Sequence, residues 1–219
     1  MTALSSAALR NRLAEKKLAR RLVVCPLLDP DNQLKAGQAS IDIRLGFEFC
    51  LVSPSAVGVV DEFADGENRL ESLSQLYRRE YVPLGGKIVI HPHQFMLAQT
   101  LEYLRFPPDL MAYVVGRSTW GRLGLIVATA VGIHPNFAGS LTLELRNLGE
   151  TPLALYPGQV IAQLFVHDVR APNGRASTAP APDAQYAGAV DMVPRRISSD
   201  GTRTAMNSLI ERFKKYQSS

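Results

Sequence analysis

Residues 123–166, "LGLIVATAVGIHPNFAGSLTLELRNLGETPLALYPGQVIAQLFV", decide the fold class. Short runs rich in Leu, Ile and Val recur along this stretch, and Gly, Pro and Asn residues separate them at intervals of about 8 to 12 residues. The predicted strands are 123–130, 141–145, 153–156 and 160–166. This rhythm is typical of a β-barrel or sandwich such as a jelly roll. Neither a βαβ pattern nor a GxGxxG loop occurs, which argues against a dinucleotide-binding fold.

The residues before this stretch continue the all-β pattern. In "ASIDIRLGFEFCLV" (39–52), apolar and polar side chains alternate until Gly46, which predicts a strand with a bend or bulge. Pro107, Pro108 and Asp109 predict a turn. Further strands are predicted at 87–92, 95–106 and 110–116. Residues 53–83 have a mixed composition that fits a short helix or an excursion loop.

The length of 219 residues fits a single domain, 1–219. Residues 1–22 are predicted to hold an N-terminal helix, because Ser5 or Ser6 can cap it and leucines recur along one side. The β-barrel is predicted at 23–170. Residues 171–200 include a Pro- and Ala-rich flexible arm, and 201–219 carry the apolar stripe of a C-terminal helix.

The composition, 46% hydrophobic and 20% charged, is that of a soluble globular protein. No apolar run approaches the roughly 18 residues of a membrane span, and no signal-peptide core is present, so we expect a cytoplasmic protein with no membrane partner. Cys25 and Cys50 are expected to be buried, reduced thiols. The net charge is +4, and the excess of basic residues lies in the two termini, where it predicts solvated helix faces and no nucleic-acid partner.

Residues 115–147 gather the candidate chemistry. Arg117, Ser118, Thr119 and Arg122 lie beside Gly116 and Gly121, a composition that suits a phosphate cradle because guanidinium groups pair with phosphate oxygens. Glu144 lies in the strand "LTLELRN". Its position in the alternation places it opposite the leucines, and this pattern alone predicts a solvent-facing residue.

Zinc chemistry is excluded, because the chain has no H-x-E with P-C-x-x-C and no clustered His and Cys ligands. His91 and His93 in "IHPHQF" are interpreted as ordinary turn histidines. No G-x-S-x-G nucleophile elbow occurs, although spacing alone leaves a Ser/His/Asp triad open.

Several motifs together resemble the metal-independent dCTP deaminases of the dUTPase superfamily. They are "ASIDIRLG", "PPDLMAYVVGRS", "GRSTWGRLGL", "FAG", "LTLELRN" and "PLALYPGQVIAQLF", in this order, and the resemblance covers residues 4–190. It implies a distorted jelly-roll β-barrel that assembles as a homotrimer with active sites between subunits. It also implies a deoxycytidine nucleotide as substrate and Mg²⁺ bound through the phosphates, with no zinc and no metal ligand on the protein.

The resemblance assigns roles residue by residue. Glu144 matches the catalytic glutamate that activates water, and Ser118 and Arg122 match the residues that hold the water and the tetrahedral centre. The remaining matches are nucleotide-binding: phosphates for Arg117 and Thr119, the base edge for Ala130, the deoxyribose for Phe137, and nucleotide contacts for His134, Gln163, Gln185 and Tyr186.

The chain also departs from the family pattern. It is one residue shorter between Arg122 and Ala130, and His134 stands where aspartate is usual, which argues against pyrophosphate cleavage. "AQYAGAV" replaces the usual Lys-Tyr pair and following Gln, so Arg175, Arg195 or Arg196 substitutes or the substrate has fewer phosphates. Deamination of dCTP to dUTP and ammonia is therefore the leading hypothesis. The alternatives are a dUTPase or bifunctional deaminase-pyrophosphatase and a non-catalytic deoxynucleotide sensor.

Overall fold

The computed structural model describes residues 2–52, 76–128, 132–169, 207, 208 and 211. The chain forms two compact units, one of Met1–Val52 with Arg79–Met192 and one of Ser53–Arg78 with Val193–Ser219. The first unit holds the β-structure and is the one described below. The predicted arm, 171–200, lies outside the described residues. Of the predicted C-terminal helix only 207, 208 and 211 are described, and these are helical.

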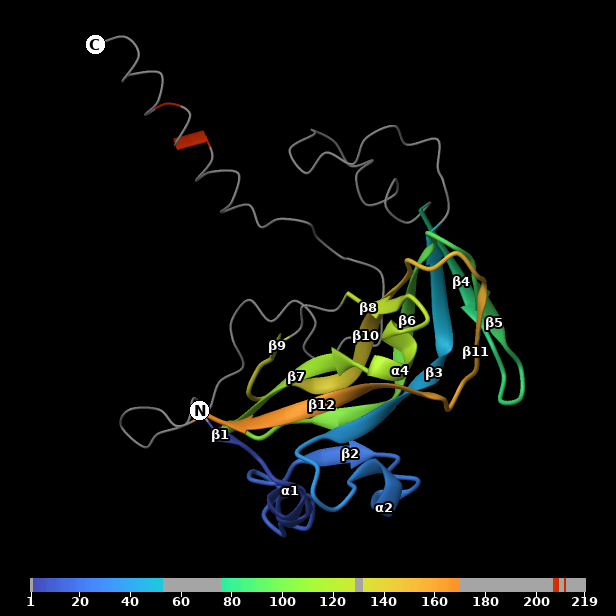
Figure 1. Ribbon diagram of the computed structural model, residues 1–219. Coiled ribbons are helices and arrows are strands. Elements are labelled where there is room, and N and C mark those ends of the chain that lie inside the picture. The colour runs from blue at the N-terminus through green and yellow to red at the C-terminus, as the bar shows by residue number, and fades with distance from the viewer. Residues whose placement is uncertain (1, 53–75, 129–131, 170–206, 209–210, 212–219) are drawn as a thin grey trace. The chain divides into compact units, whose positions relative to one another are not determined.

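The first unit is built on a curved antiparallel sheet (Figure 1). Its central path runs β8-β10-β6-β3-β12-β7-β9, while β1, β2 and β4 pair with β12, β6 and β3, and β5 pairs with β11 in a second small sheet. The strands are β1 Thr2–Ala3, β2 Val23–Cys25, β3 Ile41–Val52, β4 Tyr77–Tyr81, β5 Ile88–Ile90, β6 Phe95–Arg105, β7 Leu110–Gly116, β8 Leu125–Val127, β9 Gly132–Ile133, β10 Ala138–Asn147, β11 Leu153–Leu155 and β12 Val160–Asp168. The predicted all-β class is confirmed.

Alternation along the strands builds the core. In β10, Leu141, Leu143 and Leu145 are buried, while Thr142 and Glu144 on the opposite face are half-buried. This is the pattern of a sheet whose inner face packs against apolar side chains. The predicted leucine face of this strand is therefore confirmed.

The predicted irregularity at Gly46 is also confirmed. The pairing of β3 with β6 changes register between Leu45 and Phe49. A Cβ at Gly46 would lie 3.0 Å from the carbonyl oxygen of Gln99 and 3.1 Å from that of Thr100. Because the backbones approach so closely, glycine fits this bulge where a side chain would not.

A buried ion pair connects β3 to β6. The Glu102 carboxylate, in β6, is fully buried and accepts hydrogen bonds from the Arg44 backbone N–H (2.8 Å) and Arg44 Nη1 (3.2 Å). Gln33 Nε2 donates to the same carboxylate at 3.2 Å. Burial raises the pKa of Glu102 above its usual value, and the hydrogen bonds and charge of Arg44 oppose that rise.

The N-terminal helix is shorter than predicted. Helix α1 spans Ser6–Leu13, with Ser5 as its N-cap, and the prediction that it continues to about residue 21 is wrong. The chain turns back because the Leu22 N–H donates to the Arg12 carbonyl (3.1 Å), which buries Leu22 and leaves Leu18 61% exposed. Two short helices were not predicted, α2 (Pro30–Gln33) and α4 (Ser118–Gly121).

A bidentate ion pair holds α1 against the turn between β6 and β7. Arg12 donates to both carboxylate oxygens of Asp109, at 2.8 and 2.6 Å. These hydrogen bonds lower the pKa of Asp109. Salt links of this geometry are stronger than single surface contacts, so the pair fixes the end of α1.

The two cysteines differ in burial. Cys50 in β3 is buried, as predicted, but Cys25 is exposed, so the prediction of two buried thiols is wrong for Cys25. In the short strand β2, Val24 points into the core, and Cys25, the next residue, therefore points outward.

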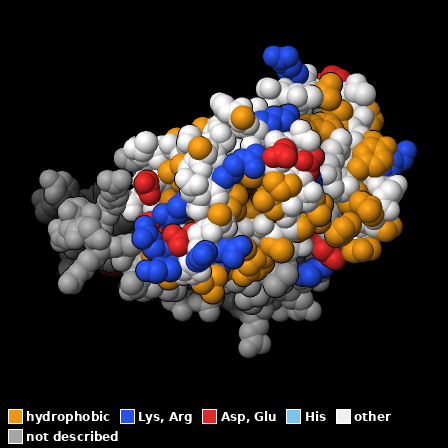
Figure 2. All heavy atoms as spheres, turned by 90° about the horizontal axis from the view of Figure 1, so that it is seen from below, with side chains coloured by type: hydrophobic (Ala, Val, Ile, Leu, Met, Phe, Trp, Pro, Cys, Tyr) orange, Lys and Arg blue, Asp and Glu red, His pale blue; other side chains and the backbone are white. Residues whose placement is uncertain are grey.

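Basic side chains gather on the side of the unit that carries α1 and α2, where acidic and apolar side chains lie among them (Figure 2). Lys16, Lys17, Arg20 and Arg21 in the loop after α1 are exposed, and Arg10 forms an ion pair with Asp31 at 3.1 Å. Within the described ranges, the structure contains no helix of sufficient length and apolar character to cross a membrane. The absence of a nucleic-acid partner stays a prediction.

Candidate functional site

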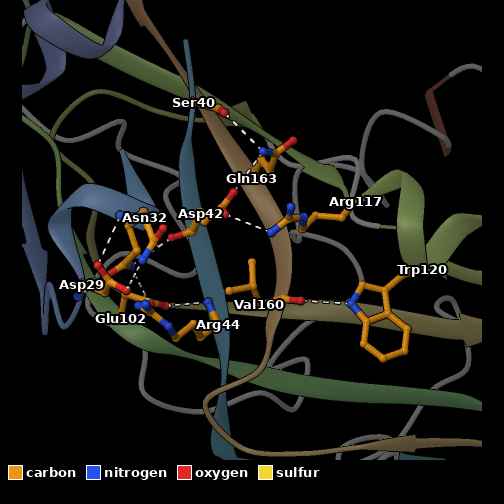
Figure 3. Close-up of polar contacts among 11 residues, drawn as sticks. Asp29, Asn32, Ser40, Asp42, Arg44, Glu102, Arg117, Trp120, Val160 and Gln163 are labelled. Carbon is orange, nitrogen blue, oxygen red and sulfur yellow. Dashed lines mark hydrogen bonds and ion pairs between the residues drawn. The ribbon is translucent and has the colours of Figure 1, made fainter. Parts of the chain in front are cut away.

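The Gly-, Arg- and hydroxyl-rich turn forms the one-turn helix α4, with Arg117 at its N-cap in an extended conformation. Three hydrogen bonds hold its backbone and ring in place. The Arg117 N–H donates to the Ile161 carbonyl (3.2 Å), and the Arg122 N–H donates to the Ser118 carbonyl (3.0 Å). Trp120 Nε1 donates to the Val160 carbonyl at 2.9 Å (Figure 3). The turn is therefore fixed to β12.

The side chains of this turn differ in exposure. Ser118, Thr119 and Arg122 are exposed and can reach a ligand. Arg117 is partly buried, and its Nη1 lies 2.9 Å from Oδ2 of Asp42. Hydroxyl and guanidinium donors on one short turn are the groups that bind phosphate oxygens. The structure thus leaves the predicted phosphate-binding side chains on a rigid backbone.

Gly124 ends this turn at φ +88°. A Cβ there would lie 2.5 Å from the backbone nitrogen and 2.7 Å from the Cα of Gly149, and the Gly124 carbonyl accepts a 2.8 Å hydrogen bond from the Leu148 N–H. The approach between the turn and the end of β10 therefore requires glycine.

We expect Gly124→Ala to lower the free energy of unfolding by about 3 kcal/mol, because alanine is strained at positive φ and would push against backbone atoms. Chemical denaturation measures the loss. Gly121→Ala is the matched control, since nothing lies within 4 Å of a Cβ at that helical position. Equal stability of the two variants would contradict this explanation.

Glu144 lies in the middle of β10, where it is half-buried. Leu97 of β6 is its partner on one side, and on the other the Ala128 N–H donates to the Glu144 carbonyl at 2.7 Å. Strand β8 follows α4 in the chain and pairs with β10, so the turn leads directly into the strand beside the Glu144 strand. The alternation correctly predicted that Glu144 lies on the face opposite the leucines. Its side chain is half-buried, however, and not fully exposed to solvent.

The segment before β10 carries two predicted contacts. His134 is exposed, and Phe137 is partly buried against the core. The Phe106 N–H donates to the Phe137 carbonyl at 2.8 Å, which holds this segment against the end of β6. Ala130, Gln185 and Tyr186 lie outside the described residues, so their assigned roles stay predictions.

Asp42 contacts the candidate site residue Arg117, and the sequence interpretation missed this contact. Its Oδ2 accepts the bond from Arg117, and its Oδ1 accepts a 2.9 Å hydrogen bond from Gln163 Nε2, which also contacts Ser40 Oγ at 3.3 Å (Figure 3). The amide nitrogen of Gln163 therefore donates its hydrogen bonds to groups of the protein itself. The only signal in the sequence was a carboxylate in the strand "ASIDIRLG", where alternation places it on the face opposite Ile41 and Ile43.

His91 and His93 lie in a turn, as predicted. The Gln94 N–H donates to the His91 carbonyl at 3.1 Å, and His93 has φ 62°. Over the residues that the structure describes, His, Cys, Asp and Glu form no group of three that could hold a metal ion.

Comparisons with known proteins identify the family of the chain. A family model described as dCTP deaminase-like matches residues 3–169. The chain is 37% identical over 206 residues to the dCTP deaminase of Natronomonas pharaonis, which covers 90% of this chain and 95% of that protein. It is 35% identical over 180 residues to the dUMP-forming dCTP deaminase of Methanothermobacter thermautotrophicus, at 82% and 87% coverage.

A solved structure has the same fold. The crystal structure of 2′-deoxycytidine 5′-triphosphate deaminase from Agrobacterium tumefaciens matches with a TM-score of 0.55 and 20% sequence identity, over 77% of this chain and 49% of that one. The match identifies the barrel architecture, and the predicted dUTPase-like type of fold is confirmed.

Proposed function

Because the chain belongs to the dCTP deaminase-like family, we propose that it hydrolyses the exocyclic amino group of a deoxycytidine nucleotide. The first candidate is dCTP, which would give dUTP and ammonia. The observation that carries the proposal is Glu144, a half-buried carboxylate on β10, the strand that neighbours the turn with Ser118 and Arg122.

The proposed reaction uses one carboxylate twice. Glu144 takes a proton from water, and the resulting hydroxide adds to C4 of cytosine while the protonated Glu144 delivers a proton to N3. Glu144 then takes the proton of the new C4 hydroxyl and passes it to the amino nitrogen, so that the C4–N4 bond breaks, the C4 carbonyl forms and ammonia leaves. Ser118 and Arg122 donate to the oxygen at the tetrahedral centre.

The other assignments complete the proposed site. Arg117 and Thr119 hold phosphate oxygens, and Phe137 packs on the deoxyribose. The backbone at Ala130 reads the base, and Gln185 with Tyr186 closes over the phosphates. His134 lies on the segment between the base and sugar contacts. Four of these side chains lie in the described part of the chain. Thr119 and His134 are exposed, and Arg117 and Phe137 are partly buried, so a nucleotide can reach them.

Mg²⁺ is proposed to accompany the phosphates and to neutralise part of their charge. The carboxylate beside the phosphate turn is Asp42, and both of its oxygens already accept hydrogen bonds from Arg117 and Gln163. This donor set fits an ion held by phosphate oxygens rather than directly by the protein. No step of the proposed chemistry uses the ion.

We further propose a homotrimer with active sites between subunits, and a cytoplasmic location, where free deoxynucleoside triphosphates are made and used. The trimer has a functional consequence, because a site between subunits would be complete only after assembly. Sedimentation of the purified protein measures the assembly.

Two alternatives stay open beside simple deamination. Relatives include proteins named dCTP deaminase and proteins named dUMP-forming, so release of pyrophosphate is the specific difference to test. The exposed His134 in place of an acid favours a deaminase that releases dUTP and does not cleave it to dUMP and pyrophosphate. A non-catalytic deoxynucleotide sensor would bind dCTP without product.

One experiment separates these functions. The purified protein is incubated with Mg²⁺ and, in separate reactions, dCTP, dCMP, deoxycytidine and dUTP, and the products are separated by chromatography. We expect dUTP from dCTP and no pyrophosphate from dUTP. Formation of dUMP and pyrophosphate from dCTP would establish the bifunctional enzyme, and the same products from dUTP alone would establish a dUTPase. Binding without product would establish the sensor, and neither binding nor turnover would overturn the proposed function.

A further inference from the structure

We propose that Asp42 is a positioning residue that presets the Arg117 guanidinium for phosphate, and that Gln163 in turn holds Asp42. The inference rests on the proposed function and deepens it. The Asp42 side chain is 6% exposed, whereas that of Arg117 is 32% exposed. The carboxylate is therefore more buried than the arginine side chain that it contacts.

Each oxygen of the Asp42 carboxylate accepts one hydrogen bond. Asp42 uses Oδ1 for Gln163 Nε2 and Oδ2 for Arg117 Nη1, both at 2.9 Å. A guanidinium has five N–H donors, and Asp42 occupies one of them, so the others can pair with a phosphate. The contact fixes the guanidinium before the nucleotide arrives.

Gln163 acts behind Asp42 rather than on the nucleotide through its nitrogen. Its Nε2 donates to Asp42 and to Ser40 Oγ, and its carbonyl oxygen points away from Asp42 (Figure 3). Ser40 is buried. The amide can therefore hold the carboxylate in one rotamer, which fixes the direction of Oδ2.

The turn itself does not depend on Asp42. Backbone and ring contacts to β12, from the Arg117 N–H to Ile161 and from Trp120 Nε1 to Val160, hold α4 independently. The buried Arg44–Glu102 pair holds the outer face of β3. Loss of the Asp42 carboxylate would thus release one guanidinium and leave the backbone around it in place.

The consequence is a specific loss of phosphate affinity. A long side chain that must be ordered on binding weakens binding by roughly 3- to 10-fold. We therefore expect Asp42→Asn to raise KM for dCTP and the inhibition constant of inorganic triphosphate by this factor, while kcat changes less than about twofold. A merely structural role would lower activity through unfolding and would not raise both constants together.

Asp31→Asn is the matched control, because it removes a carboxylate from the exposed Arg10–Asp31 pair. Its constants should equal those of the wild type. Unchanged KM and triphosphate inhibition in Asp42→Asn, with an active wild type, would overturn the inference. If the wild type does not deaminate dCTP, the proposed function fails, and calorimetric binding of triphosphate to the same variants still tests Asp42.

A second variant tests whether Gln163 acts through Asp42, and it can be measured even if Asp42→Asn does not fold. Gln163→Met removes the donor to Asp42 with little change in size and should raise the triphosphate constant, but less than Asp42→Asn does. Because Gln163 acts through Asp42, the double variant should equal Asp42→Asn alone. If the double variant raised the triphosphate constant by the product of the two single effects, or if Gln163→Met had no effect, the proposed chain of contacts would be contradicted.

Discussion

Glu144→Gln is expected to lower kcat for dCTP deamination by about 10³-fold or more, since general acid–base catalysis contributes roughly 10² to 10⁴ and one group here serves both steps. Glutamine keeps the shape of the side chain but cannot accept a proton from water. The residue is half-buried in β10, where the core contacts belong to Leu143 and Leu145. Stability and nucleotide binding should therefore change little.

The assay compares single-turnover rates for the variant and the wild type at saturating dCTP. Glu150→Gln is the matched control, since that side chain is 87% exposed in the turn after β10, and it should retain the wild-type rate. Calorimetric binding of dCTP to Glu144→Gln separates lost chemistry from lost affinity. A variant that keeps more than about a tenth of the wild-type rate would show that another group activates the water.

Arg44→Met is expected to produce the largest loss of stability, about 3 to 5 kcal/mol at pH 8, because it leaves the Glu102 carboxylate buried without its charged partner. Methionine replaces much of the arginine stem, so lost packing contributes little. The Arg44 backbone N–H and Gln33 still donate to the carboxylate. These bonds cannot replace the charge.

The loss should depend on pH with a definite sign. Burial already raises the pKa of Glu102, and the charge and side-chain hydrogen bond of Arg44 limit the rise, so the variant raises this pKa further. A carboxyl whose folded pKa exceeds its unfolded value stabilises the fold at low pH, and that contribution disappears as pH rises through the folded pKa. The deficit of Arg44→Met should therefore be smaller at pH 5 than at pH 8.

Urea denaturation at both pH values, for the wild type and the variant, measures the effect. Arg10→Met is the control, because its partner Asp31 is 93% exposed and surface pairs contribute about 1 kcal/mol or less. A deficit that is the same at pH 5 and pH 8 would mean that the Glu102 charge is not its cause.

The sequence predicted those features that a local pattern determines. The leucine alternation of 141–145 and the glycine at 46 follow from the pleat and from close backbone approach, and both are present in β10 and β3. The extent of the N-terminal helix was wrong, because its end depends on a hydrogen bond between Leu22 and Arg12. No periodicity within the helix encodes that contact.

The candidate site shows the same limit. The composition of residues 117–122 predicts a phosphate-binding turn, since glycine, hydroxyl and guanidinium groups lie together in the chain, and phosphate binding there stays a prediction. Asp42 was missed because it reaches Arg117 only when β3, β12 and α4 are assembled, and 75 residues separate the two in sequence. Alternation assigned Glu144 to a solvent face and separated Asp42 from the isoleucines, and what covers those side chains is a property of the tertiary structure.

The most direct measurement is the stoichiometry of products from dCTP. The purified wild-type protein is incubated with dCTP and Mg²⁺, and ammonia and uracil nucleotides are quantified in the same sample. Deamination predicts one ammonia for each dUTP formed, and neither product from Glu144→Gln. Unchanged dCTP with the folded wild-type protein, or equal product from the wild type and Glu144→Gln, would contradict a glutamate-dependent deaminase.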